Sequence, residues 1–124
     1  MRSRYDEPAI IPFQPLQPGK RILVCRRDDL EAKLTEAGTN LVVIDFYATW
    51  CGPCKMIAPK LEELAQAHPE IVFLKVDVDE CEDVAAAYEI SVMPTFVFIK
   101  EKKKLTSFSG SNFDKLKEVV LTHK

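Results

Sequence analysis

The stretch that decides the fold runs from Asp45 to Lys55 and reads DFYATWCGPCK. Its first residues end an apolar run, 41–47, in which Asp45 is the one charged residue. Such a run is typical of a strand that is covered on both faces of a sheet. The last residues of the stretch begin a segment, 51–67, that we predict to be a helix with a kink at Pro59.

Two cysteines three residues apart stand at the start of this predicted helix. Cys51 and Cys54 would face the same side one turn apart, within reach of the Cα separation of about 5.5 Å that a disulfide prefers. The unpaired N–H groups of a helix start favour a thiolate, which predicts a nucleophile at Cys51 and a shielded, resolving thiol at Cys54. Gly52 allows close backbone approach, and Pro53 stiffens the first turn. The alternative is a buried, inert pair.

Strand and helix patterns alternate on both sides of this stretch. We expect strands at 21–25, 41–47, 71–76, 95–99 and 105–109, and helices from Asp28 or Asp29 to Gly38, over 51–67, over 80–88, and from a capping box at Ser111 and Asp114 onward. The order βαβαβαββα implies parallel pairing at the front and an antiparallel hairpin near the end. The expected fold class is therefore α/β, with a central mixed five-stranded sheet flanked by four helices.

Residues 1–19 differ in composition from the rest of the chain, because four of the eight prolines fall there. Proline fixes its own φ and pushes the preceding residue toward extended conformations. We therefore expect a proline-rich N-terminal extension at 1–19 and one domain at 20–124. The extension could be a free tail, a docking segment, or a strap packed over the body through Ile10, Ile11 and Phe13.

Composition excludes several classes of protein. A chain of 124 residues that is 47% apolar and 29% charged is long enough for one core and is not typical of disorder. Seventeen basic against nineteen acidic residues leave no positive surplus for a nucleic-acid partner. No apolar run approaches the roughly 20 residues of a membrane-spanning helix, and we see no secretion signal at the start. We expect a soluble protein.

The stretch DFYATWCGPCK closely resembles the active-site segment of the thioredoxin family. The likeness covers about residues 20–124. KVDVD at 75–79 is similar to the family's third core strand, MPT at 93–95 to its cis-proline loop, and FSG at 108–110 to the loop before its last helix. The resemblance implies the thioredoxin fold and a protein dithiol–disulfide oxidoreductase that reduces exposed protein disulfides.

The resemblance also implies roles for single residues. Cys51 would attack a substrate disulfide, and Cys54 would then attack Cys51 and release the reduced substrate. Asp45 would be the general base that deprotonates Cys54 through water, with its pKa raised by burial. Lys75 matches the family's buried lysine and would pair with Asp45. The alternative is that Lys75 only neutralises Asp45 structurally.

A flat, mostly apolar docking surface would surround the cysteines. By resemblance, the bond before Pro94 is cis and turns the Met93 backbone toward Cys51, where an extended substrate could pair with it. The alternative for Pro94 is the first residue of a strand. The expected substrate-binding residues are Trp50, Gly52, Pro53, Met93, Pro94 and Gly110. Trp50 as core filler is the alternative to its place on this surface.

The resemblance implies partners but no bound cofactor and no metal. The oxidised pair would be recycled by thioredoxin reductase, a flavoenzyme, so that NADPH is used indirectly. We further expect a monomer in the cytoplasm, and also in the nucleus, that contacts neither nucleic acid nor membrane. Two rivals remain: a non-catalytic binding module on the same fold, and an oxidase or isomerase of secreted disulfides. A broken cysteine pair or a missing Asp45 would mark the first, and a signal peptide would mark the second.

Two further cysteines stand outside the C-x-x-C pair. Cys81 matches a position at which some animal members of the family hold a regulatory cysteine, although its acidic neighbours disfavour a thiolate. Cys25 is expected to be core packing. With a single C-x-x-C, the spacing does not predict a zinc site.

Overall fold

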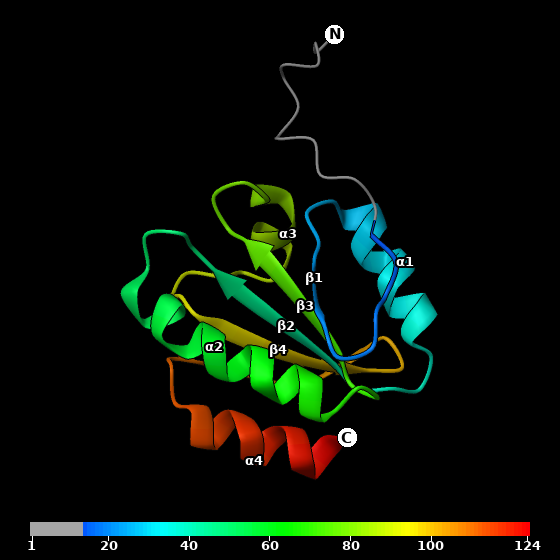
Figure 1. Ribbon diagram of the computed structural model, residues 1–124. Coiled ribbons are helices and arrows are strands. Elements are labelled where there is room, and N and C mark those ends of the chain that lie inside the picture. The colour runs from blue at the N-terminus through cyan, green and yellow to red at the C-terminus, as the bar shows by residue number, and fades with distance from the viewer. Residues whose placement is uncertain (1–13) are drawn as a thin grey trace, which may run out of the picture.

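The computed structural model describes residues 14–124, which form a sheet enclosed by helices (Figure 1). In chain order, the elements are β1 (Arg21–Leu23), α1 (Arg27–Ala37), β2 (Val42–Tyr47), α2 (Gly52–Ala67), β3 (Val72–Asp77), α3 (Glu82–Ala87), β4 (Thr95–Lys100), β5 (Lys103–Ser109) and α4 (Phe113–His123). This is the predicted order of elements. The expected packing of Ile10, Ile11 and Phe13 lies outside the described residues.

The sheet has the strand order β1-β3-β2-β4-β5, with β2 at its centre. β3 runs parallel to both β1 and β2, whereas β4 is antiparallel to β2 and to β5. Asp45 of β2 therefore has Lys75 of β3 on one side and Phe96 of β4 on the other. The predicted mixed sheet is confirmed, and the carboxyl ends of β2 and β3 meet at one edge, where sites of α/β proteins gather.

Helices cover both faces of the sheet. α2 and α4 lie side by side on one face (Figure 1), where Leu61 and Leu116 join one buried cluster. α1 and α3 contribute Leu34 and Val84 to a second cluster on the other face. Each such side chain stabilises the fold by about 1.5–3 kcal/mol when it is fully buried. Within residues 14–124, no helix is both long and apolar enough to cross a membrane.

The start of α1 differs from the prediction. The helix begins at Arg27 with Arg26 in the N-cap position and no capping side chain, so neither Asp28 nor Asp29 is the cap. Both acids lie in the first turn instead, where a negative charge is favoured by the positive end of the helix dipole. The expected end is confirmed, because Gly38 follows the helix with a φ of +61°.

The predicted capping box of α4 is wrong by one residue. Asn112, not Ser111, is the N-cap, and its side-chain oxygen accepts a hydrogen bond from the Lys115 N–H at 3.1 Å. An amide oxygen caps a helix about as well as a hydroxyl. Asp114 consequently lies in the first turn of α4 and is not the acidic partner of a capping box.

The hairpin between β4 and β5 turns through two residues without a glycine. Glu101 and Lys102 both have left-handed backbones, with φ values of +53° and +66°. Two-residue hairpin turns of this kind favour Asn-Gly, because L side chains bear roughly 1–2 kcal/mol of strain in the left-handed region. The Lys102 ammonium lies 2.8 Å from Glu31 of α1 in an exposed ion pair. The expected antiparallel hairpin is therefore present, and a tight, lysine-rich turn with strained residues at its tip joins its strands.

Candidate active site

The cysteine pair lies where β2 gives way to α2. Cys51 occupies the N-cap position of α2, and Cys54 lies in its first turn. The two form a disulfide with Cα atoms 5.3 Å apart, and the Cys54 N–H points at Cys51 Sγ over 3.2 Å. After reduction, the same N–H and the positive end of the helix dipole favour a thiolate at Cys51.

Burial does not distinguish the two cysteines. Cys51 is 5% exposed and Cys54 is 6% exposed, so the expectation that only Cys54 is shielded is not met. Gly52 and Pro53 between them are exposed at the surface. The two cysteines therefore differ in their position at the start of α2 and not in their exposure.

Trp50 stands at the surface beside the disulfide. Its side chain is 65% exposed, and its indole N–H donates to Asp79 Oδ2 at 2.7 Å. Asp79 follows β3, and its own N–H and that of Glu80 donate to Asp77 Oδ1. Trp50 is therefore not core filler, and its ring is oriented by the turn that follows β3.

The loop before β4 forms the other wall of the site. The Met93–Pro94 peptide bond is cis, as the resemblance implied, and the Met93 carbonyl oxygen lies 3.7 Å from Cys51 Sγ. The Gly110 N–H donates to the Pro94 carbonyl at 2.9 Å, which brings Gly110 to the same loop. The structure thus gathers residues from three separate segments around the Cys51–Cys54 disulfide.

Asp45 lies in the sheet with its carboxylate almost fully buried. Burial raises the pKa of Asp45 from 3.8 to about 6, and Arg21 and, more weakly, Lys75 oppose this rise. Arg21 Nη1 lies 2.9 Å from Asp45 Oδ2, whereas Oδ1 has no hydrogen-bond partner. Arg21 also donates through Nε to Glu62 Oε2 at 2.7 Å. The ion pair of Asp45 is therefore with Arg21.

Sequence reasoning missed Arg21 as a partner of Asp45 and named Lys75 alone. Lys75 lies opposite Asp45 in the β2–β3 register and lowers the pKa of Asp45 by its charge. Arg21 belongs to β1, which is two strands away from β2, and its long side chain reaches across. Only the strand order could reveal this contact, because nothing in the sequence near Arg21 indicates which strand it lies beside.

The raised pKa of Asp45 predicts a stability that depends on pH. Between pH 4 and 6 the folded chain holds a proton that the unfolded chain has released, so the free energy of unfolding falls as the pH rises. A shift from 3.8 to about 6 corresponds to about 3 kcal/mol. We expect Asp45→Asn to remove this fall, which urea unfolding between pH 3.5 and 7.5 would measure.

The control for that prediction is Glu63→Gln, which removes an exposed carboxylate from the middle of α2. Its unfolding curve should follow that of the unaltered chain at each pH. Equal pH dependence in the Asp45→Asn chain and the unaltered chain would contradict the assignment.

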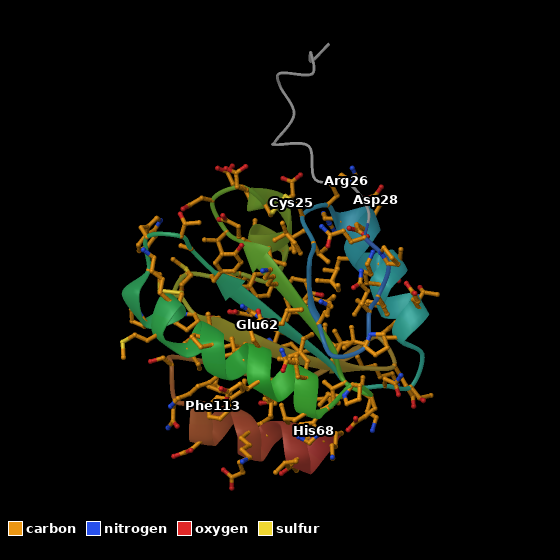
Figure 2. The ribbon with its side chains drawn as sticks, in the orientation of Figure 1. Cys25, Arg26, Asp28, Glu62, His68 and Phe113 are labelled. Atoms are coloured by element: carbon orange, nitrogen blue, oxygen red, sulfur yellow. A yellow bond between two sulfur atoms is a disulfide. The ribbon has the colours of Figure 1, made fainter. Side chains whose placement is uncertain are left out.

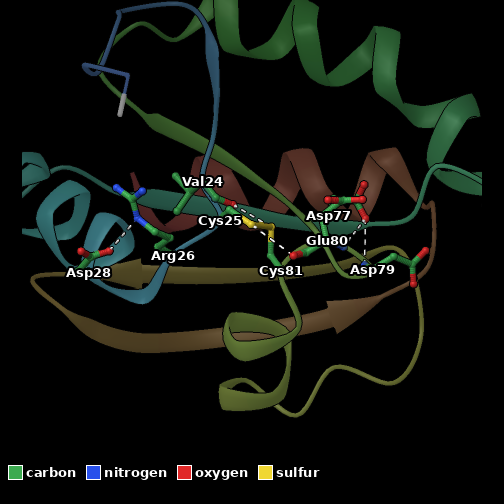
Figure 3. Close-up of a disulfide and its surroundings, with 8 residues drawn as sticks. All are labelled: Val24, Cys25, Arg26, Asp28, Asp77, Asp79, Glu80 and Cys81. Atoms are coloured by element: carbon green, nitrogen blue, oxygen red, sulfur yellow. Dashed lines mark hydrogen bonds and ion pairs between the residues drawn. A yellow bond between two sulfur atoms is a disulfide. The ribbon is translucent and has the colours of Figure 1, made fainter. Parts of the chain in front are cut away.

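The structure contains a second disulfide, which belongs to a different buried cluster from the first (Figure 3). Cys25, just after β1, bonds to Cys81, the residue before α3, across a sequence separation of 56 residues. Their Cα atoms are 4.9 Å apart, and both residues are buried. Cys25 Sγ lies 3.6 Å from the Glu80 carbonyl oxygen, and Cys81 Sγ lies 3.8 Å from that of Val24. The predicted core packing of Cys25 is therefore confirmed, and the sequence did not reveal that Cys25 is also a covalent link to Cys81.

The arrangement is suited to thiol–disulfide exchange. A disulfide at a helix start lies close to an exposed indole, and the same sheet holds a buried carboxylate whose pKa is raised to about 6. A thiolate at such a position attacks a disulfide sulfur, and a neighbouring thiol resolves the mixed disulfide. In the part of the chain that the structure describes, no three His, Cys, Asp or Glu side chains gather as a metal site.

Comparisons with known proteins agree with this chemistry. The family model described as Thioredoxin matches residues 21–122. Thioredoxin-T of Drosophila melanogaster is 54% identical over 101 residues, which cover 81% of this chain and 64% of the relative. The crystal structure of Fasciola hepatica thioredoxin is 50% identical with a TM-score of 0.82 and covers 83% of this chain and 99% of its own.

A further solved structure contains a partner protein. It is described as ferredoxin:thioredoxin reductase and thioredoxin f2 complex, and its matching chain is 31% identical with a TM-score of 0.82, covering 86% of this chain and 97% of its own. The match of the family model spans both disulfides and all the residues of the predicted site. The chain is a disulfide oxidoreductase and belongs to the thioredoxin family.

Proposed function

We propose that the chain reduces exposed disulfides of other proteins, with Cys51 as nucleophile and Cys54 as resolving thiol. The observation that carries this is the Cys51–Cys54 disulfide at the start of α2, beside the Met93 carbonyl. The Cys51 thiolate attacks one sulfur of the substrate disulfide. A bond forms between Cys51 and that sulfur, the substrate bond breaks, and the other substrate sulfur leaves as a thiolate and takes a proton from water.

Asp45 acts in the second step as the general base. The Cys54 proton passes to Asp45 through water, and the Cys54 sulfur attacks Cys51 Sγ. The Cys51–Cys54 bond forms, the bond to the substrate breaks, and the second substrate sulfur leaves reduced. The substrate has gained two electrons and the chain has lost two. A pKa of about 6 leaves most Asp45 carboxylates charged at neutral pH, so they can accept this proton.

The substrate docks on the surface around Cys51. Trp50 offers an exposed apolar face, and the exposed Gly52 and Pro53 leave the disulfide accessible from that side. An extended substrate segment pairs with the Met93 backbone, as peptides do when they add to a sheet edge. Pro94 and Gly110 hold this loop in place through their 2.9 Å hydrogen bond.

The oxidised chain returns to the dithiol through thioredoxin reductase, a flavoenzyme that takes electrons from NADPH. Support comes from the solved complex of a related thioredoxin with a reductase, although that reductase is of another type. This cycle fits an animal-type thioredoxin of the cytoplasm and nucleus, acting as a monomer.

A coupled assay tests the proposed function. The full chain is mixed with NADPH, an animal thioredoxin reductase and insulin, which presents disulfides in a folded protein. We expect NADPH to be consumed in proportion to the insulin disulfides reduced, and to be spared when Cys51→Ser replaces the unaltered chain. If dithiothreitol reduces the Cys51–Cys54 disulfide but the reductase does not, the proposed recycling partner is wrong.

A further inference from the structure

Arg21 is clamped between two carboxylates that belong to different layers. Its Nη1 lies 2.9 Å from Asp45 Oδ2, and its Nε lies 2.7 Å from Glu62 Oε2. The Arg21 and Asp45 side chains are 7% and 9% exposed, whereas that of Glu62 is 46% exposed. Glu62 is on the sheet-facing part of α2 (Figure 2). The three residues therefore form a line from water to the buried carboxylate.

The two carboxylate oxygens of Asp45 differ in their hydrogen-bond partners. Oδ2 is held by the guanidinium, while Oδ1 is buried and has no hydrogen-bond partner. A buried carboxylate oxygen without a partner is costly, so its retention calls for an explanation. An oxygen that must take up a proton during the reaction has to be free of a donor, and Oδ1 meets this condition.

Arginine suits this position because its charge is fixed. Its guanidinium does not lose its proton in proteins, whereas a buried lysine shifts its pKa readily. A guanidinium with several donors can also hold two carboxylates in one geometry, as Arg21 holds Asp45 and Glu62.

We propose that Arg21 is a positioning residue for Asp45: it holds Oδ2, keeps the carboxylate ionised, and leaves Oδ1 free to accept the proton released at Cys54. The inference rests on the proposed role of Asp45 as general base. It concerns the second step alone, in which the proton leaves the Cys54 thiol as its sulfur bonds to Cys51 Sγ.

The elements packed around Asp45 carry other groups that bear on its ionisation. From β3, Lys75 also favours the charged form of Asp45, but more weakly than Arg21. On β2 itself, the charge of Asp45 contributes to the raised pKa of Tyr47. From β4, Phe96 lies opposite Asp45 and adds no charge. From α2, Glu62 reaches Asp45 only through Arg21, and the disulfide lies at the start of the same helix.

The test compares the full reduced chain with Arg21→Gln, Arg21→Lys and Lys20→Gln. The ionisation of Asp45 is followed by the carbon-13 chemical shift of its carboxyl group over pH 4–9. An adjacent arginine lowers the pKa of a carboxyl by about 1–3 units, so Arg21→Gln should raise that of Asp45 by a similar amount. Arg21→Lys should reverse at least half of that rise. Lys20→Gln, which removes a neighbouring exposed cation, should leave Asp45 unchanged.

The rate of the second step gives the kinetic readout. The rate of substrate release from a preformed Cys51 mixed disulfide should depend on pH, and the midpoint of this dependence should lie at higher pH in Arg21→Gln. If the pKa of Asp45 rises by two units, the rate at pH 7 should be lower by about tenfold. In an Asp45→Asn background, Arg21→Gln should leave the profile unmoved. An unchanged Asp45 titration in Arg21→Gln overturns the inference.

The two proposals fail in different ways. A displaced titration of Asp45 with an unchanged rate profile supports control of Asp45 by Arg21 and overturns the base role of Asp45. An unchanged titration with a rate profile that Asp45→Asn does alter overturns the role of Arg21 and supports the base. If Arg21→Gln weakens folding, Arg21→Lys still tests the inference, because an ammonium cannot hold Asp45 and Glu62 in the geometry of the planar guanidinium. The pKa of Asp45 should then be higher than in the unaltered chain, and an identical titration overturns the role of Arg21.

Discussion

Replacing either active-site cysteine is expected to abolish turnover, but in two different ways. Cys51→Ser removes the thiolate that attacks the substrate, so no mixed disulfide should form. Cys54→Ser leaves that attack intact and removes the thiol that resolves it, so a covalent complex should accumulate. We expect a fall of about a thousandfold or more in the coupled assay for both variants, as for other nucleophile losses.

Mass spectrometry without reductant distinguishes the two variants. A species with the summed mass of chain and substrate should appear with Cys54→Ser and be absent with Cys51→Ser. The double variant Cys25→Ala/Cys81→Ala, which keeps the Cys51–Cys54 pair, is the matched control and should turn over within about threefold of the unaltered chain. A trapped complex with Cys51→Ser would reverse the assigned roles, since Cys51 and Cys54 are almost equally buried.

The site around Cys51 was predictable because its determinants are local in sequence. A glycine and a proline between two cysteines at the end of an apolar run specify a helix start, and the structure places α2 at Gly52 accordingly. The cis bond before Pro94 could be predicted only by resemblance. Helix caps were less certain, because Asn112 and Ser111 are adjacent residues of nearly equal capping strength.

The contacts that sequence reasoning missed join segments far apart in the chain. Arg21 reaches Asp45 across 24 residues, and Cys25 meets Cys81 across 56. Arg21 lies in β1, and Cys25 lies just after it. The three residues of β1 do not indicate that this strand pairs with β3, because that pairing depends on the topology of the whole sheet. The sequence around a cysteine at the end of a short strand is the same whether the side chain packs in the core or forms a disulfide. Only the folded structure could therefore reveal the bond of Cys25.

The structure assigns to Cys25–Cys81 a part in stability, and its removal should have a large effect. The bond closes a loop of 56 residues and ties the edge strand β1 to the start of α3 (Figure 3). A cross-link of that span restricts the unfolded chain by an amount worth about 4 kcal/mol. We expect Cys25→Ala/Cys81→Ala to lower the unfolding midpoint by about 15 °C in a calorimeter under non-reducing conditions.

The Cys51–Cys54 bond supplies the comparison, since it spans only three residues and should restrict the unfolded chain far less. A Cys51→Ala/Cys54→Ala chain should therefore lose less than half as much stability as Cys25→Ala/Cys81→Ala, yet lose all turnover. If instead Cys25→Ala/Cys81→Ala lost all turnover while Cys51→Ala/Cys54→Ala had the larger loss of stability, Cys25–Cys81 would be the redox centre. Because Cys25 and Cys81 are buried in a different apolar cluster from Cys51 and Cys54, we expect their bond to act on folding and not on substrates.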